Sequence, residues 1–140
     1  MRRAAPLLVL RYAWALPATA LGAVALGLAV LAGARVRRID GTLEVGGGGV
    51  RAVVAALPRR LRFDAITLGH VIVGVDHARL AALRVHERVH VAQYERWGPL
   101  FIPLYLGASL VAWIGGEDPY LANVFEREAR RAESAGGTQC

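Results

Sequence analysis

Long uncharged stretches alternate with short charged stretches along this chain of 140 residues, and the alternation predicts its main elements. Residues 12–34 hold no charged side chain and would extend about 35 Å as a helix, more than the ~30 Å of a bilayer core. A second uncharged run, residues 99–116, is at the lower length limit for a membrane span. We expect this second run to be buried or interfacial ahead of spanning.

The first uncharged run has three interpretations, which are an uncleaved membrane anchor, a secretory signal and a buried core helix. Ala32-Gly33-Ala34 resembles a signal cleavage site, but the apolar stretch is longer than the roughly 7–15 residues of a signal. Gly22, Gly27 and Pro17 would weaken a helix inside a soluble core. We therefore expect an anchor, with a signal peptide as the alternative. Three arginines on each side of the run leave its orientation open.

The rest of the chain has the pattern of a small α+β domain. It predicts strands at residues 42–45 and 66–73, and helices at residues 50–57, 77–97 and 119–135. Asp76 is a good N-cap for the long helix, which Gly98 and Pro99 end. Asp118 and Pro119 form a start signal for the last helix. The predicted division is an anchor or signal peptide (1–38), one domain (39–135) and a tail (136–140).

Composition excludes other classes of protein. Hydrophobic residues make up 55% of the chain and charged residues 20%, which excludes an intrinsically disordered protein. The net charge is +6, but all 17 basic residues are arginine, which indicates compositional bias and not a nucleic-acid surface. No basic cluster is interleaved with aromatic residues. Cys140 is the single cysteine, so we expect neither a disulfide nor a cysteine-based metal site.

The segment His86-Glu87-Arg88-Val89-His90 carries the candidate chemistry and falls within the long predicted helix. Histidines four residues apart lie on one helical face, so both imidazoles can bind one Zn²⁺. Glu87 would lie beside the ion and act as general base, because zinc lowers the pKa of bound water towards about 7. The alternative is a solvated face of histidine and glutamate. The two histidines share the apolar face with Leu83 and Trp97, which favours the metal site.

A catalytic zinc needs a third protein ligand, and spacing alone does not choose it. His77 lies too far along the helix axis from His86, and His70 would line the site from the strand without binding metal. The last predicted helix offers three candidates, which are Asn123, Glu126 and Glu128. Asn123 and Glu126 share a face, whereas Glu128 points nearly opposite to Glu126. A surface salt bridge with Arg130 is the alternative role of Glu126.

Two segments resemble known zinc metallopeptidases. Phe125-Glu126-Arg127-Glu128-Ala129 resembles the Glu-x-x-Ala-Asp segment that supplies the third ligand in the CAAX prenyl protease and bacterial heat-shock membrane protease class. Residues 63–132 are similar to small bacterial metallopeptidase domains of the gluzincin type. That similarity rests on three segments in chain order, which are Ala65-Ile66-Thr67-Leu68-Gly69 with Val71-Ile72-Val73, His86-Glu87-Arg88-Val89-His90-Val91-Ala92-Gln93, and Glu126-Arg127-Glu128-Ala129.

The resemblance implies a minimal zincin-like fold in which Glu126 is the third ligand and Ala129 a close-packing residue. Arg130 stands where the family has aspartate, so a residue that would orient a ligand is missing. The strand before the metal helix would be a sheet edge that holds an extended peptide. The residues expected on that edge are Thr67, Gly69 and Val71.

Four further polar residues are expected to support the site. Gln93 follows His90 by one turn on the same face, where it would support a ligand. Asn123, His70 and Tyr120 are expected to support a ligand or to donate to an oxyanion, a role also open to Tyr105.

The sequence therefore predicts a membrane-anchored zinc metallopeptidase with one Zn²⁺ per chain, in a bacterial inner membrane. Its partners would be a peptide or protein substrate and membrane lipid, without nucleic acid. The alternative is a zincin-like scaffold that binds zinc at the membrane without hydrolysing peptides. A small membrane protein with accidental histidines is the third possibility, and bound metal would exclude it. Substrate specificity, membrane orientation and oligomeric state are left open.

Overall fold

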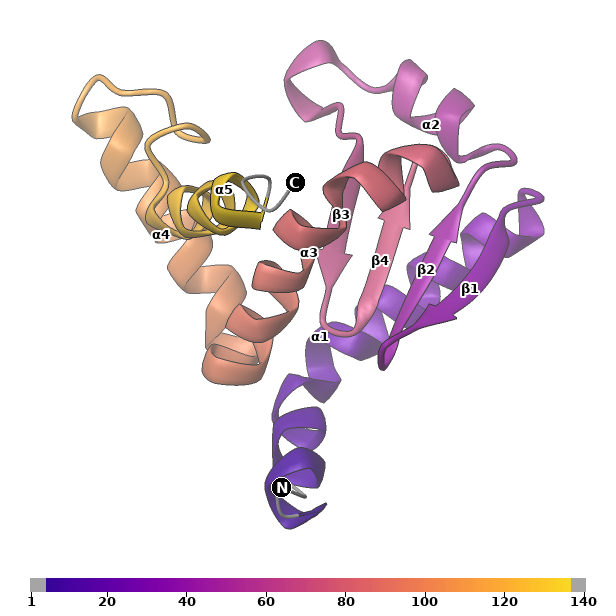
Figure 1. Cartoon of the computed structure of the whole chain (residues 1–140). Coiled ribbons are helices and arrows are strands. Elements are labelled where there is room, and N and C mark those ends of the chain that lie inside the picture. Colours follow the sequence, from indigo (N-terminus) through magenta and orange to yellow (C-terminus); the bar gives the residue numbers. More distant parts are fainter. Residues whose placement is uncertain (1–4, 137–140) are drawn as a thin grey trace.

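The computed structural model describes residues 5–136, where the chain folds as an α+β domain around one four-stranded sheet (Figure 1). In chain order the elements are α1 (Ala5–Leu31), β1 (Arg35–Ile39), β2 (Thr42–Gly46), α2 (Val50–Ala56), the short 3-10 helix η1 (Arg59–Leu61), β3 (Ala65–Leu68), β4 (Val71–Gly74), α3 (His77–Trp97), the 3-10 turn η2 (Gly98–Leu100), α4 (Phe101–Ile114) and α5 (Val124–Gly136). The α+β class is confirmed, and the zincin-like fold stays a prediction. The predictions on Cys140 and on the arginines before residue 5 lie outside the described residues.

The sheet is mixed, with strand order β1-β2-β4-β3. β2 and β4 are parallel, whereas the β1–β2 and β3–β4 pairs are antiparallel. All of β4 is buried because helices cover both faces of the sheet. Val71 and Val73 cluster with Ala29 of α1, and Ile72 packs with Leu80 of α3. α1 and α3 therefore form layers on opposite faces of the sheet.

The prediction of one strand over residues 66–73 is wrong, because the chain turns in the middle of it. Gly69 has a φ of +63°, and β3 pairs with β4 as an antiparallel hairpin. A Cβ atom at Gly69 would lie 2.2 Å from Thr19 Oγ1, so the turn and the packing of α1 both require glycine. β3 is a sheet edge as expected and carries Thr67. Gly69 lies in the turn and Val71 lies on the inner strand β4, so neither belongs to the edge.

β1 is an additional strand, in a segment that the hydrophobic pattern assigns to the end of the anchor. It pairs with β2 along its whole length, from Arg35 opposite Gly46 to Ile39 opposite Thr42. The connecting residues, Asp40 and Gly41, have φ values of 46° and 85°. Positive φ at both central residues is the requirement of a type I′ hairpin turn, for which Asp-Gly is a favoured pair. The Asp-Gly pair is thus the local signal for this hairpin.

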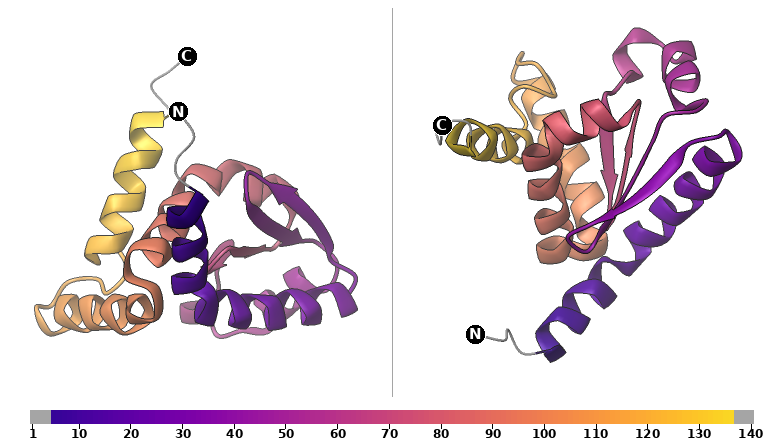
Figure 2. Two further views of the ribbon diagram at one scale, coloured as in Figure 1. Left: turned by 90° about the horizontal axis from the view of Figure 1, so that it is seen from below. Right: turned by 45° about the vertical axis from the view of Figure 1, so that its right-hand side comes forward.

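α1 lies along the sheet with a face of small residues against the domain (Figure 2). Ala15, Ala18 and Ala29 are buried there. A Cβ atom at Gly22 would lie 2.6 Å from Leu68 O, so glycine permits the close approach of helix and hairpin. The expectation that Gly22 disfavours a packed helix is therefore wrong. α1 is an outer layer of the domain, with its large aliphatic side chains on the opposite, exposed face.

Among the described residues, two helical stretches are long and apolar enough to cross a membrane, namely Pro6–Leu31 and His77–Ile114. The first is nearly the whole of α1, and the second joins α3, η2 and α4. The core helix of a soluble protein and a signal sequence share these properties. A choice between these possibilities therefore needs the packing of each helix.

The long helix α3 begins and ends as predicted. Asp76 Oδ1 accepts a hydrogen bond from the backbone N–H of Arg79 at 2.8 Å, which caps the first turn. Gly98 ends the helix with a φ of 54°. β2 and α2 likewise match the strand predicted at residues 42–45 and the helix predicted at residues 50–57 to within one residue.

The last helix begins later than predicted. Asp118 Oδ1 accepts hydrogen bonds from the backbone N–H groups of Tyr120 and Leu121, which closes a turn and not a helix. Asn123 takes the capping role, since its Oδ1 accepts from the N–H of Phe125 at 2.9 Å. The start of α5 is therefore set by Asn123, and the second uncharged run forms η2 and α4 before it.

Candidate metal centre

α3 carries the three residues of the motif at buried positions. Leu80 is almost completely buried and packs against Ile72, which fixes the helix to the sheet. His86, Glu87 and His90 follow within the next three turns, on the part of α3 that packs against α5 and β3. The prediction that both histidines lie on a buried face is confirmed.

α5 brings Glu126 to this part of α3. Ala129 is completely buried, and its small side chain allows the two helices to pack closely. Gln93 joins the helices, because its Nε2 donates to Phe125 O at 3.1 Å and to Glu128 Oε2 at 2.8 Å. Glu126 therefore faces the histidines, whereas Glu128 lies at the half-exposed edge of the helix interface.

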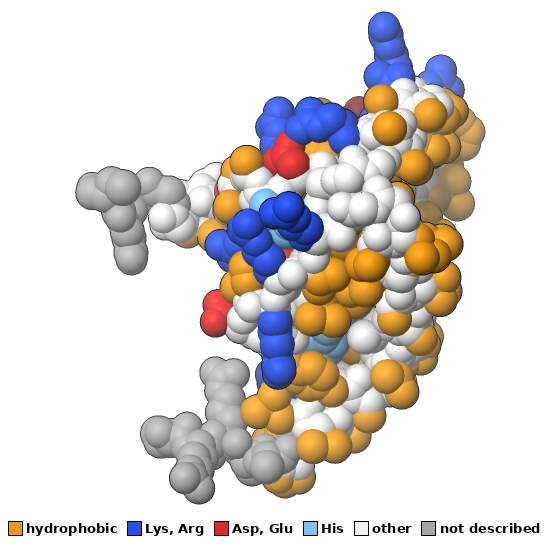
Figure 3. All heavy atoms as spheres, turned by 90° about the vertical axis from the view of Figure 1, so that its right-hand side faces the viewer, with side chains coloured by type: hydrophobic (Ala, Val, Ile, Leu, Met, Phe, Trp, Pro, Cys, Tyr) orange, Lys and Arg blue, Asp and Glu red, His pale blue; other side chains and the backbone are white. Residues whose placement is uncertain are grey.

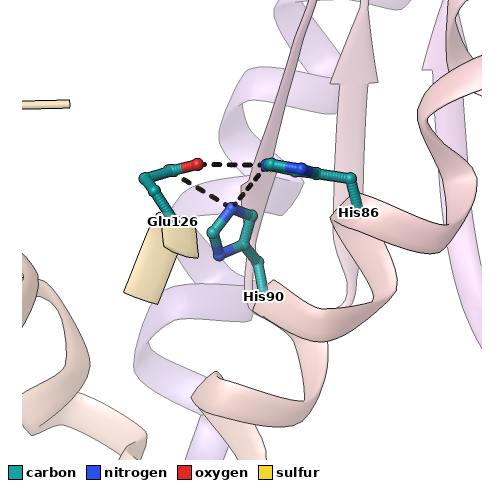
Figure 4. Close-up of side chains that lie close together, drawn as sticks. All are labelled: His86, His90 and Glu126. Carbon is teal, nitrogen blue, oxygen red and sulfur yellow. Dashed lines mark hydrogen bonds and ion pairs between the residues drawn. The ribbon is translucent and has the colours of Figure 1, made fainter. Parts of the chain in front are cut away.

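The side chains of His86, His90 and Glu126 converge on one point (Figure 4). His86 Nε2 lies 3.2 Å from His90 Nε2 and 3.1 Å from Glu126 Oε2, and His90 Nε2 lies 3.3 Å from Glu126 Oε1. Ligand atoms about 2.0–2.1 Å from a tetrahedral Zn²⁺ lie about 3.3 Å from one another. The spacing and chemistry of these three donors therefore fit a metal ion, and zinc suits two imidazoles with a carboxylate.

Each imidazole has a polar partner beside its Nδ1 atom, on the side away from this point. His90 Nδ1 donates to Gln93 Oε1 at 2.8 Å. His86 Nδ1 lies 3.4 Å from Glu133 Oε2, so a carboxylate faces the far side of this ring. A proton on Nδ1 leaves Nε2 as the atom with a free lone pair. Gln93 thus contacts His90, as its position one turn later predicts, and Glu133 lies beside His86.

Glu87 is held from the sheet. Thr67 Oγ1 on the edge strand β3 donates to Glu87 Oε2 at 2.7 Å, and both side chains are buried. Burial raises the pKa of Glu87 above its ordinary value, and the hydrogen bond from Thr67 only partly offsets that shift. A carboxyl with a raised pKa is suited to both accepting and returning a proton near neutral pH.

The ligand cluster stabilises negative charge on Glu126. Burial opposes ionisation of this carboxyl, but hydrogen bonds from His86, His90 and Tyr105 outweigh burial and hold its pKa well below the ordinary range. The hydrogen bond to Glu126 raises the pKa of His86 despite burial. For His90, burial lowers the pKa, but the interactions with Glu126 outweigh it and the net direction is upward. The metal-free cluster thus holds protons that a metal ion would displace.

Two tyrosines approach Glu126 from its other side. Tyr105 of α4 donates its hydroxyl to Glu126 Oε1 at 2.6 Å, which orients the carboxylate. Tyr120 is half-exposed, and partial burial together with the Glu126 carboxylate raises its pKa to about 12. Its hydroxyl therefore remains a donor at neutral pH. Asn123 contacts neither histidine, since its Nδ2 donates to Tyr105 O and Ser109 Oγ and thereby joins α5 to α4.

His70 and His77 do not join the cluster. His70 lies in the β3–β4 turn, where its Nδ1 is 3.3 Å from Thr19 Oγ1 and its Nε2 is 3.1 Å from Glu95 Oε1. Its ring also stacks on Tyr12 of α1, with centroids 4.0 Å apart. The prediction that His70 lines the site is therefore wrong, because the turn directs it towards α1. His77 begins α3, too far from His86 as predicted.

Glu133 is the site residue that sequence reasoning missed. The available signal is its spacing, since it lies seven residues after Glu126 and thus two turns along the same face of α5. Arg130, which replaces the aspartate of the resembling families, does not contact the cluster. Its Nη2 donates to Leu121 O, and its guanidinium lies 5.6 Å from the centre of the Tyr120 ring. Arg130 thus binds the α4–α5 loop. The carboxylate near His86 is that of Glu133, about one turn later on α5.

Comparisons with protein-family models, with curated proteins and with solved structures found no match to this chain. The resemblance to gluzincin-type peptidases therefore rests on the residues quoted above and stays a prediction. The buried group of two histidines and one glutamate stands on the geometry alone.

Proposed function

We propose that this protein is a zinc-dependent hydrolase that cleaves peptide bonds. The observation that carries the proposal is the convergence of His86, His90 and Glu126 at tetrahedral spacing, with Glu87 next to the first histidine. Zinc bound there would polarise a water molecule and the carbonyl of the substrate. Side chains of the protein would supply the remaining steps, which are proton transfer and hydrogen bonding to the carbonyl oxygen.

Glu87 is the proposed general base and acid. It would take a proton from the attacking water as the water oxygen bonds to the carbonyl carbon. It would then deliver that proton to the leaving nitrogen as the C–N bond breaks. Thr67 holds one carboxylate oxygen of Glu87, which leaves the other for the proton. Tyr120 is the proposed donor to the carbonyl oxygen, because its side chain is half-exposed beside Glu126, whereas Tyr105 is less exposed and donates to Glu126 at 2.6 Å.

A peptide paired along β3 is the proposed substrate. β3 is an edge of the sheet, so its outer backbone groups are available to an added strand. The same strand carries Thr67, which contacts Glu87, so a peptide on this edge would pass close to the proposed base. Gly69 and Val71 do not belong to this edge, and the proposed docking strand is shortened accordingly to Ala65–Leu68.

Metal analysis of the purified full chain tests the metal part of the proposal. Wild type and His77→Ala should each retain about one zinc per chain, whereas His86→Ala and His90→Ala should retain almost none. His77 is the matched control because it lies on the same helix outside the cluster. Wild-type protein without zinc, after expression in zinc-supplemented medium, would overturn the proposal.

Hydrolysis is tested separately from metal binding. Glu87→Gln should retain zinc and lose cleavage of a mixed peptide library followed by mass spectrometry. A residual rate in Glu87→Gln equal to that of wild type would exclude Glu87 as the base.

Zinc binding without hydrolysis is the second candidate function. Burial favours it, since Glu126, His86 and His90 are only 3%, 6% and 8% exposed. In that case Glu87→Gln and wild type would give identical peptide profiles while both retain zinc.

We further propose that the protein works at a membrane, and the sequence predicts that this is a bacterial inner membrane. The two long apolar helical stretches support this location. Fractionation of cells that express the full chain tests it, and recovery of the protein in the soluble fraction would contradict it.

A further inference from the structure

Large aliphatic side chains form a stripe on the outer face of α1 after its midpoint. Leu21, Val24, Leu28 and Leu31 recur at intervals of three or four residues, and each is between 57% and 87% exposed. The opposite face of the same helix packs on the sheet through alanine and glycine. The stripe is therefore a surface feature of the folded domain and not an unpaired half of its core.

α4 carries a second apolar surface on the same side of the molecule. Its outer side chains include Val111, Trp113 and Ile114, which are 67–72% exposed. The left view of Figure 2 shows α4 and the later half of α1 along one edge, with the sheet and α5 away from it. Figure 3, seen from the side of the molecule away from α4, shows hydrophobic side chains along the convex outline, whereas most charged side chains lie on the opposite side. Two helices distant in sequence thus make one apolar surface.

We propose that the later half of α1 and the whole of α4 lie in the plane of a lipid bilayer, embedded in one leaflet, and do not cross it. This inference specifies how the chain contacts the membrane and is independent of the metal chemistry.

Helix length favours an in-plane arrangement. α4 has 14 residues and is therefore about 21 Å long, shorter than the ~30 Å of the hydrocarbon core. The part of α1 after Pro17 has a similar length, and Figure 2 shows α1 bending near its middle. Neither segment reaches across a bilayer by itself.

The packing of α1 also opposes a spanning arrangement. Tyr12 Oη donates to Gly41 O, and the backbone N–H of His70 donates to Thr19 Oγ1. These contacts tie α1 to the polar turns of the sheet, and Arg11 lies 3.6 Å from Glu95 of α3. A perpendicular α1 would either break these contacts or draw strands and charges into hydrocarbon, where unpaired backbone groups are very costly. An in-plane helix keeps every one of these contacts on its protein-facing side, away from the acyl chains.

Lipid fits this surface better than a second copy of the chain. Residues 12–34 and 99–116 contain no charged residue, so the surface offers no ion pairs to a protein partner. The outline in Figure 3 is convex, so two copies would touch there over a small area, whereas fluid lipid adapts to a convex face. Trp113 near the end of α4 has the amphipathic ring that prefers the boundary between headgroups and acyl chains.

Binding of the purified full chain to vesicles tests the surface. Wild type should float with phosphatidylcholine vesicles, with and without phosphatidylglycerol, and should stay bound in high salt because burial of apolar groups is not screened. Val24→Glu and Val111→Glu should each weaken binding about tenfold or more. Val85→Glu is the matched control, since Val85 is exposed on α3 next to the metal ligands, and it should bind as wild type does. Equal effects of all three substitutions, or binding that salt abolishes, would overturn the proposal.

The in-plane arrangement is tested by the sides on which the two ends of α1 lie. A cysteine added before Met1 and an Asp40→Cys substitution would each be made in a Cys140→Ser chain. A membrane-impermeant maleimide is then applied to right-side-out and inside-out membrane vesicles. Reaction of both cysteines in the same preparation supports the proposal. Reaction in opposite preparations means that α1 spans, and a lipid-free dimer that does not float means that a second copy covers the surface. Either result would overturn the proposal.

Discussion

Two histidine–carboxylate clusters lie on opposite sides of α3, and they differ in what their histidines face. In the first, two Nε2 atoms from His86 and His90 converge on both oxygens of Glu126. In the second, the single ring of His70 lies between Thr19 and Glu95, with one partner at each nitrogen. Glu95 follows His86 by nine residues, which places it half a turn around the helix.

The difference shows how histidines that can bind a metal ion differ from a histidine that only connects elements of the fold. Each imidazole of the first cluster has a polar partner beside Nδ1, Gln93 for His90 and Glu133 for His86, and its Nε2 points towards the shared point. Both ring nitrogens of His70 contact protein groups and the ring stacks on Tyr12, so neither nitrogen is available to a metal ion. Burial and a nearby carboxylate are common to both clusters and therefore do not identify the metal site.

The largest expected effect is the loss of metal from Glu126→Gln. An amide is a poor replacement for an ionised ligand, so this variant should retain almost no zinc, while Glu128→Gln should retain as much as wild type. Zinc at about 1,000 times its Kd would stabilise wild type by about 4 kcal/mol, and thermal unfolding should show that gain vanish in Glu126→Gln. Loss of zinc from Glu128→Gln with retention by Glu126→Gln would mean that α5 is turned the other way.

A smaller effect is expected from Glu133→Gln. The substitution removes the charge of the carboxylate that lies 3.4 Å from His86 Nδ1, and partners of this kind are worth about 10–100-fold in metal affinity. Competition with a fluorescent zinc chelator measures the affinity. Glu117→Gln, a change of the same kind in the α4–α5 loop, should leave the affinity unchanged. Equal affinities for the two variants would mean that the contact of Glu133 does not orient His86.

His70→Ala should destabilise the fold without affecting the metal. The substitution removes the partners of Thr19 and Glu95 and the stacking on Tyr12, at a cost of about 1–3 kcal/mol in the free energy of unfolding. His77→Ala should cost much less, because the ring nitrogens of His77 have no hydrogen-bond partner among the described residues. Urea unfolding and zinc content check both statements. Loss of zinc from His70→Ala would contradict the prediction, because it would mean that metal binding depends on the His70 cluster.

The last prediction concerns pH. The pKa values of His86 and His90 are raised above 6.5, so in metal-free protein their stabilisation is complete below that pH and is lost as pH rises through the folded values. The lowered pKa of Glu126 acts in the opposite sense, and its stabilisation is lost only as pH falls below 4.5. Metal binding requires neutral imidazoles, so the gain in Tm from zinc should grow between about pH 6 and 8. A gain that does not change with pH would contradict the role of these protons.

Local patterns predicted the parts of the site that lie on one helix. The capping residue Asp76 and the glycine after Trp97 set the bounds of α3, and the four-residue spacing places His86 and His90 on one face. Glu126 was identified through a resemblance and not through spacing, because a position on a second helix depends on how that helix is rotated. Glu133 was missed because its partner, His86, is 47 residues away in the chain.

The failures have physical causes of the same kind. Asp118-Pro119 is a start signal, but the chain there closes a turn, since Asn123 is held by Tyr105 and Ser109 of α4. A β-branched run predicted one strand where the close approach of α1 to Gly69 accompanies a turn. In both places a contact between distant elements decides between two conformations that are locally acceptable.

The sequence by itself determined the α+β class, the long apolar first helix and a helical pair of histidines, because these follow from hydrophobic periodicity and spacing within one element. Only the tertiary structure decided that α1 covers the sheet through its small residues, that β3 and not β4 forms the edge, and that α5 presents Glu126 to the histidines. The reason is that rotation and register are set by side chains that pack across elements, and no local pattern contains both partners of such a contact.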